Sequence, residues 1–170
     1  MSDGIDWPAR YAPARMPVHV VNRIAAGVPA HLVWSRLIRA ADWPAIYANA
    51  ANVRVEGGGA DLFDGARFTW RTFDVSLKSR VLDFTPETRI AWLATSPGVT
   101  AYHAWLITPT PTGCTILTEE TQRGLVARAG RLLFPQRMEQ WHQKWLEALA
   151  APPQRAGASG QRVGTGSAPE

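Results

Sequence analysis

The strongest constraint on the fold is a run of six predicted β-strands joined by connections too short for a crossover. Apolar and polar residues alternate near 51–57, 66–73, 75–84, 88–95, 99–109 and 113–122. Turn-forming stretches such as Gly57-Gly58-Gly59 and Ser96-Pro97-Gly98 separate these segments. Parallel neighbours need connections of about a dozen residues or more. The sequence therefore predicts an antiparallel sheet.

Three further elements precede this run. Alternating residues predict a first strand at about 16–26. Pro29 then opens a short helix near 29–39, and Asp42 starts a second helix near 42–48. The predicted sheet thus has seven strands, with two short helices after the first.

A long amphipathic helix is predicted after the last strand. At about 100° per residue, one side of this helix carries Met138, His142, Trp145 and Leu149. A second apolar stripe begins upstream at Leu125 but is offset from that side by close to half a turn. Pro135 explains the offset, because proline breaks or kinks a helix, here near Phe134.

This order of elements, from about residue 16 to 150, resembles the helix-grip fold of the START-related superfamily, which includes birch-pollen-allergen-like and polyketide cyclase/dehydrase-like proteins. The segments AYHAWLITPT (101–110), ILTEETQRG (116–124) and FPQRM…HQKWLEAL (134–149) resemble bacterial members of the polyketide cyclase/dehydrase-like branch. The resemblance implies an α+β fold in which a seven-stranded antiparallel sheet wraps around the long C-terminal helix. It also implies a cavity for an apolar or aromatic ligand, and it transfers no universal catalytic motif.

The length of 170 residues suits one domain. We expect an N-terminal arm at 1–15, a helix-grip ligand-binding domain at 16–150 and a disordered tail at 151–170, because the tail lacks the apolar content to fold. The N-terminus shows no apolar core of a secretory signal, and no apolar stretch approaches about 18 residues. The single Cys114 fits a reducing compartment. These features predict a cytoplasmic protein without membrane insertion.

The formal charge of +4 is modest and the arginines are dispersed, so no nucleic-acid partner is expected. The four histidines show no metal-ligand spacing, and the glycine triplet at 57–59 has neither a Walker lysine nor dinucleotide-binding spacing. We therefore predict no metal and no cofactor. Oligomeric state does not follow from the sequence.

Strand alternation predicts which side chains face the cavity. Trp70 shares a strand face with Phe68, and Trp92 lies on the corresponding face of a later strand. For 99–109 we place His103 and Trp105 inward, although the set beginning at Tyr102 satisfies the alternation almost as well. The predicted ligand-binding residues are Phe68, Trp70, Leu77, Trp92, Trp105, Thr118, Met138 and His142.

Tryptophan supplies eight of the sixteen aromatic residues, so the role of these rings matters. Trp70, Trp92 and Trp105 either stack on a planar ligand or fill the core. The tryptophans on helical stripes, Trp34, Trp43, Trp141 and Trp145, are expected to pack in the core.

The last strand adds a candidate acid. Placing Thr118 and Glu120 inward leaves Glu119 in solvent and brings Glu120 near His103, with His142 approaching from the helix. Desolvation would raise the pKa of Glu120 and a protonated histidine would lower it, and either arrangement suits proton transfer. Glu120 and His103 are therefore the candidate catalytic residues. The alternative is a structural acid satisfied by an arginine or a backbone N–H.

Three functions remain open at this point. The first is binding of a hydrophobic or aromatic small molecule in the cavity. The second is a polyketide cyclase/dehydratase-like enzyme that uses Glu120 and His103 for proton transfer. The third is a protein-interaction module of the chaperone or ribosome-associated type, which a filled core and a large exposed apolar patch would favour.

Overall fold

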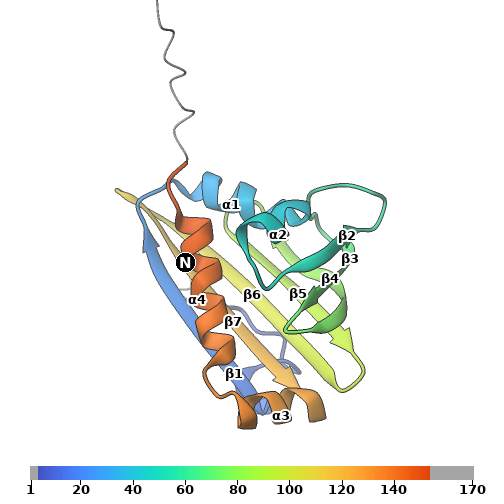
Figure 1. Cartoon of the computed structure of the whole chain (residues 1–170). Helices are drawn as coiled ribbons and strands as arrows, with labels where there is room; N and C mark the ends of the chain where they lie inside the picture. The colour runs from blue at the N-terminus through green and yellow to red at the C-terminus, as the bar shows by residue number, and fades with distance from the viewer. Residues whose placement is uncertain (1–3, 154–170) are drawn as a thin grey trace, which may run out of the picture.

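The computed structural model describes residues 4–153 and is an α+β structure with one seven-stranded antiparallel sheet (Figure 1). The strands are β1 (Val18–Ala26), β2 (Ala51–Val55), β3 (Arg67–Thr72), β4 (Val75–Thr85), β5 (Arg89–Ser96), β6 (Val99–Thr110) and β7 (Gly113–Arg123). Their order across the sheet is β1-β7-β6-β5-β4-β3-β2. Every pair of neighbours from β2 to β7 is consecutive in the chain, as expected for hairpin-length connections.

The helices are α1 (Ala30–Ile38), α2 (Trp43–Ile46), α3 (Leu125–Leu133) and α4 (Arg137–Ala150), with short 3-10 turns η1 (Pro13–Arg15) and η2 (Ala40–Asp42). Helix α4 runs along the sheet beside β1, where Asn22 donates to the Glu139 carbonyl at 3.1 Å. Helices α1 and α2 cover one end of the sheet (Figure 1). The predicted helix-grip architecture is confirmed, and the break between α3 and α4 falls at Pro135 as predicted.

The core is built around the tryptophan of α2. The Trp43 ring centroid lies 5.3 Å from Trp70, 5.6 Å from Trp92 and 5.0 Å from Trp145. The Trp43 indole N–H donates to the Leu37 carbonyl at 2.9 Å, so its one polar group is satisfied. Trp34 is also buried as predicted, and Trp141 is partly buried against the same core.

The opposite face of the sheet is covered by the N-terminal segment at its central strands. Tyr11 stacks on Tyr102 with ring centroids 5.1 Å apart and an interplanar angle of 11°. The Thr121 hydroxyl donates to the Tyr11 carbonyl at 2.9 Å. Strand β6 is therefore buried on both faces, which is why its sequence alternation was ambiguous. His103 does point inward, toward α4.

The covered outer face corrects one expectation. Glu119 does not lie free in solvent: its side chain is 14% exposed and its carboxylate lies 2.8 Å from His19 Nε2. The Trp7 ring packs edge-on against His19 at 5.9 Å. The predicted solvent exposure of Glu119 was wrong because the N-terminal segment packs over β1 and β7, and strand alternation gives no information about that packing.

Glycine is required where β7 turns into α3. Gly124 has a φ of 118°, and a Cβ there would lie 2.2 Å from the Gly98 carbonyl oxygen. The backbone N–H of Val126 donates to that same oxygen at 3.0 Å. This close approach fixes the start of α3 against the β5–β6 turn. Of the predicted tail at 151–170, residues 154–170 lie outside the described residues.

Candidate ligand-binding site

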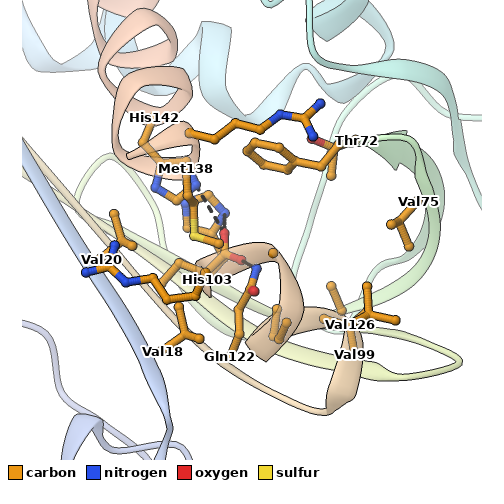
Figure 2. Close-up of a pocket in the computed structure, with 18 of the residues that line it drawn as sticks. Val18, Val20, Thr72, Val75, Val99, His103, Gln122, Val126, Met138 and His142 are labelled. Atoms are coloured by element: carbon orange, nitrogen blue, oxygen red, sulfur yellow. Dashed lines mark hydrogen bonds and ion pairs between the residues drawn. The ribbon is translucent and has the colours of Figure 1, made fainter. Parts of the chain in front are cut away.

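A cavity of about 370 Å³ lies between the sheet, α4 and α3 (Figure 2). Most of its walls are apolar side chains from β1, β3, β4, β5 and β6 and from both helices. Its polar lining groups are Tyr47, Thr72, His103, Glu120, Gln122, Arg131, Arg137 and His142. A volume of this size and a mostly apolar wall are typical of small-molecule sites.

Seven of the ten predicted site residues line this cavity: Trp70, Leu77, Trp92, His103, Glu120, Met138 and His142. Strand alternation placed the five strand residues of this group, and helical phase placed Met138 and His142. Whether any of them binds a ligand stays a prediction.

Phe68, Trp105 and Thr118 face inward but do not line the cavity. Phe68 packs edge-on against Trp43 at 5.7 Å, so α2 fills the space above it. Trp105 is fully buried against Trp145 at 5.0 Å, and Thr118 is fully buried beside His103. Alternation identifies the face of a strand, but the stretch of that face left uncovered depends on where the helices lie.

Gln122, Tyr47 and the lining residues from α3 were not predicted. Strand alternation does indicate Gln122, because it is two residues beyond Glu120 and so shares its strand face. No sequence signal was available for Tyr47, whose ring stacks on Trp145 with centroids 4.4 Å apart. Burial raises the pKa of Tyr47 well above its ordinary value, so this cavity group is a neutral phenol.

At the inner wall, Glu120 is held by three side chains from three elements (Figure 2). Its Oε2 lies 3.1 Å from His103 Nδ1 on β6 and 3.2 Å from His142 Nε2 on α4. Its Oε1 accepts a hydrogen bond of 2.5 Å from the Gln122 amide. His103 and Glu120 are opposite each other in the β6–β7 register, which brings their side chains together. Helix α4 supplies His142. We call His103, Glu120 and His142 the His–Glu–His cluster.

The hydrogen-bond partners of His103 indicate which of its ring nitrogens carries the proton. The Thr118 hydroxyl lies 2.8 Å from His103 Nε2 and 3.2 Å from the Ala104 carbonyl. This hydroxyl can donate to the Ala104 carbonyl, and the direction of its contact with Nε2 depends on the tautomer of His103. The Glu120 carboxylate only accepts, so a neutral His103 carries its proton on Nδ1 and donates it to Glu120. The unprotonated Nε2 then accepts the hydrogen of the Thr118 hydroxyl. His142 Nε2 donates to the same oxygen, and His142 Nδ1 has no hydrogen-bond partner among the described residues.

The pKa shifts agree with that proton assignment. Burial lowers the pKa of His103 from 6.5 to about 3, outweighing the attraction of Glu120. Burial acts to raise the pKa of Glu120, but the attraction of His103 in its protonated form and hydrogen bonds from His142 and Gln122 outweigh it and lower the pKa to about 2. At neutral pH the cavity wall therefore presents a carboxylate supported by a neutral His103.

Thr118, His103 and Glu120 form a hydroxyl–imidazole–carboxylate chain, the order of groups in a nucleophilic triad. Thr118 is fully buried and does not line the cavity, so its hydroxyl cannot reach a bound molecule. His103 and Glu120 are the members of this chain that border the cavity.

The His–Glu–His cluster is also a group that could hold a metal ion, since its ligand atoms lie within 4.8 Å of one another. Sequence spacing did not show this grouping, because the three residues lie on separate elements. The Oε2–nitrogen distances of 3.1 and 3.2 Å are those of hydrogen bonds, and ligand atoms at about 2.0–2.2 Å from one tetrahedral ion have similar separations. We describe these contacts as hydrogen bonds. The predicted absence of a metal stays a prediction that elemental analysis of the purified protein can test.

Comparison with solved structures supports the fold. The crystal structure of hypothetical protein jhp0584 from Helicobacter pylori is 28% identical, with a TM-score of 0.81, over 88% of this chain and 96% of that one. The di-domain ARO/CYC StfQ from the steffimycin biosynthetic pathway is 14% identical, with a TM-score of 0.64, over 78% of this chain and 50% of that one. Truncated norcoclaurine synthase from Thalictrum flavum is 13% identical, with a TM-score of 0.60, over 78% and 91%.

No protein-family model and no curated protein matches the sequence. The structural matches agree with the resemblance noted in the motifs of β6, β7 and α4. This chain therefore has the helix-grip fold, which it shares with these solved structures.

Proposed function

We propose that this protein binds a hydrophobic or aromatic small molecule in the cavity and holds a polar group of that molecule at Glu120. The observation that carries this proposal is an apolar cavity of about 370 Å³ that ends on a buried, ionised carboxylate. The cavity also counts against the protein-interaction hypothesis, which a filled core together with a large exposed apolar patch would favour. The fold is shared with StfQ and norcoclaurine synthase, which supports a small-molecule site without naming the ligand.

The charge of Glu120 indicates what the ligand carries. A carboxylate offers about four acceptor positions, and three are taken by His103, His142 and Gln122. The remaining position accepts a hydrogen bond from a hydroxyl or an N–H. A ligand carboxylate would instead meet a like charge in a dry cavity, which is unfavourable. The ligand class is therefore an apolar or aromatic body with a hydroxyl or amine donor.

Tryptophan fluorescence tests this assignment, because Trp70 and Trp92 line the cavity. We expect 2-naphthol to quench the emission and to bind at least about ten-fold more tightly than 2-naphthoate, which differs in its charged group. Glu120→Gln should abolish most of this preference. Glu119→Gln is the matched control, because Glu119 lies on the opposite face of β7. Absence of quenching, or an equal response to both probes, would contradict the proposed binding mode.

A second candidate is proton transfer by Glu120, with His103 as its partner, on a polyketide-like substrate. The His–Glu–His cluster on the cavity wall favours it geometrically. The pKa of about 2 weighs against it, since a general base works best with a pKa near the operating pH. Ligand binding is therefore the better supported of the two functions.

Turnover separates the two candidates. If Glu120 is a base, Glu120→Gln lowers turnover of an aromatic polyketide-like substrate by roughly 100-fold or more, and retained affinity shows that the cavity is intact. Thermal unfolding of the same variant verifies the fold. Unchanged turnover in a folded Glu120→Gln protein rules out the catalytic role and leaves ligand binding.

A further inference from the structure

Helix α3 turns its apolar side away from the protein. Leu125 is 80% exposed, Leu132 81% and Leu133 68%, and Phe134 directly after the helix is 56% exposed. Ala127 is the one buried residue within α3. Apolar stripes of surface helices ordinarily face the core. In α3 the tertiary structure does not cover the stripe.

Helical phase shows that these side chains form a continuous surface. Leu125 and Leu132 are seven residues apart and lie on nearly one line, with Leu133 beside them at about 100° per residue. Ala127 lies on the other side of the helix, toward the sheet. We call Leu125, Leu132, Leu133 and Phe134 the α3 apolar surface.

The charged residues of the segment that carries this surface are all basic. The segment from Arg123 to Arg137 contains four arginines and no acidic residue, and Asp74 lies 3.6 Å from Arg137. Arg128 and Arg131 lie along one edge of the apolar stripe. Arg131 donates to the Pro135 carbonyl and lies 3.3 Å from Glu139, so part of its charge is compensated within the protein. Arg128 is exposed.

Helix α3 is also weakly supported by its own sequence. It has nine residues, and isolated helices shorter than about 12–15 residues are marginal in water. Gly130 stands in its interior, where glycine is a poor helix former, and nothing lies within 4 Å of the position of a Cβ there. An external surface that covers the apolar stripe would stabilise this helix.

We propose that α3 docks on an anionic lipid bilayer, lying in the interface with Leu125 and Leu132 toward the acyl chains and Arg128 toward the phosphates. A short amphipathic helix with leucine and phenylalanine on one face and arginine beside them suits such a surface. A second copy of the chain suits it less, because an isologous contact would place the arginines of two α3 helices together. No helix among residues 4–153 is long and apolar enough to cross a bilayer.

Docking would place the cavity mouth at the bilayer. Leu133 and Phe134 belong to the α3 apolar surface and also line the cavity, together with Val126 and Gly130 of α3. Figure 2 labels Val126, Val99 and Gln122 among the lining residues. Figure 1 shows α3 at the end of the sheet opposite α1 and α2. Resting on the proposed function, we infer that the hydrophobic ligand enters from the bilayer through this mouth.

Vesicle flotation tests the docking without any added ligand. Full-length protein is mixed with anionic vesicles of phosphatidylcholine and roughly 30% phosphatidylglycerol. A second sample uses vesicles of phosphatidylcholine alone. We expect binding to the anionic vesicles, weakened by about ten-fold at high salt because the arginine contribution is screened. The double variant Leu125→Ser/Leu132→Ser should lose at least about ten-fold in binding. Neither leucine lines the cavity, so the ligand site stays intact.

The matched controls remove the same kind of side chain elsewhere. Val21→Ser/Phe63→Ser deletes two exposed apolar residues remote in sequence from α3. Arg128→Gln should weaken binding to the anionic vesicles, and Arg80→Gln, at another exposed arginine, is its control. Equal losses in test and control variants would overturn the proposal. So would failure to bind anionic vesicles, or a concentration-dependent dimer that the leucine variant abolishes. A vesicle-negative protein that still binds 2-naphthol would refute docking and leave the proposed function standing.

Discussion

At the residue scale, the His–Glu–His cluster shows how burial and hydrogen bonding compete over one proton. Desolvation disfavours the charged form of both His103 and Glu120, yet only His103 ends neutral. The reason is that Glu120 accepts hydrogen bonds from three side chains, whereas His103 needs no charge to donate one of them. The carboxylate is thereby kept ionised at the edge of an apolar cavity, which is the basis of the proposed recognition of a hydroxyl or amine.

These shifts predict acid sensitivity of the fold. The folded protein resists protonation of His103 down to a pKa of about 3, whereas the unfolded chain protonates it near 6.5. Stability from this group is therefore complete above pH 6.5 and is lost as the pH falls toward 3, by up to about 1.4 kcal/mol per pH unit. Glu120 adds a further loss below its ordinary pKa of 4.5.

Urea denaturation between pH 7.5 and roughly 4.5 measures this slope. His103→Gln should flatten it, whereas His31→Gln should leave it unchanged because His31 is exposed on α1. A slope that is the same in all three proteins would contradict the assignment of a neutral, buried His103.

At the element scale, the break between α3 and α4 and the turn from β7 into α3 determine the shape of the cavity mouth. Pro135 ends one helix, and α4 restarts with its apolar line toward the sheet. Gly124 lets α3 begin in contact with the β5–β6 turn. Together they hold the short α3 across the open end of the cavity while its apolar surface stays outward.

Gly124→Ala should distort this junction. Its φ of 118° and the 2.2 Å approach of a Cβ to the Gly98 oxygen both oppose a side chain. We expect a loss of roughly 1–3 kcal/mol in the free energy of unfolding. Gly59→Ala is the control, since nothing lies within 4 Å of a Cβ at that position. Equal unfolding free energies for the two variants would show that the junction tolerates a side chain.

At the scale of the whole molecule, the central strands of the sheet are covered on both faces, by α4 and the cavity on one side and by residues of the N-terminal segment on the other. Tyr11 is 2% exposed and stacks on Tyr102. The segment thus completes a second apolar cluster, with Met16, Ala91 and Ala104. The cavity lies on the far side of the sheet from this cluster.

Tyr11→Ala should therefore destabilise the protein without altering the cavity walls. Truncation of a large buried aromatic residue costs about 3–5 kcal/mol. We expect the midpoint of thermal unfolding to fall while 2-naphthol binding to the folded protein stays within about two-fold. Arg15→Ala, at an exposed position in the same segment, should change neither. A weakened 2-naphthol affinity in folded Tyr11→Ala protein would mean that the two faces are coupled.

Local sequence patterns determined the elements and most of their faces. Alternation in β3, β5 and β7 and helical phase in α4 suffice because each of these elements has a buried side that differs chemically from the other. The prediction of Trp70, Trp92, Glu120 and His142 as cavity-facing residues followed from these periods alone. The order of elements, together with short turns, then restricted the sheet to antiparallel neighbours.

Only the tertiary structure decided which inward side chains remain uncovered and which groups meet. Trp105 and Phe68 have the same strand period as the cavity residues, but packing from α2 and α4 covers them. The ionised state of Glu120 depends on contacts with Gln122, His103 and His142, which lie on three different elements. The exposure of the α3 apolar surface depends on the turn at Gly124. These outcomes are fixed by contacts between segments distant in sequence, which local periodicity does not encode.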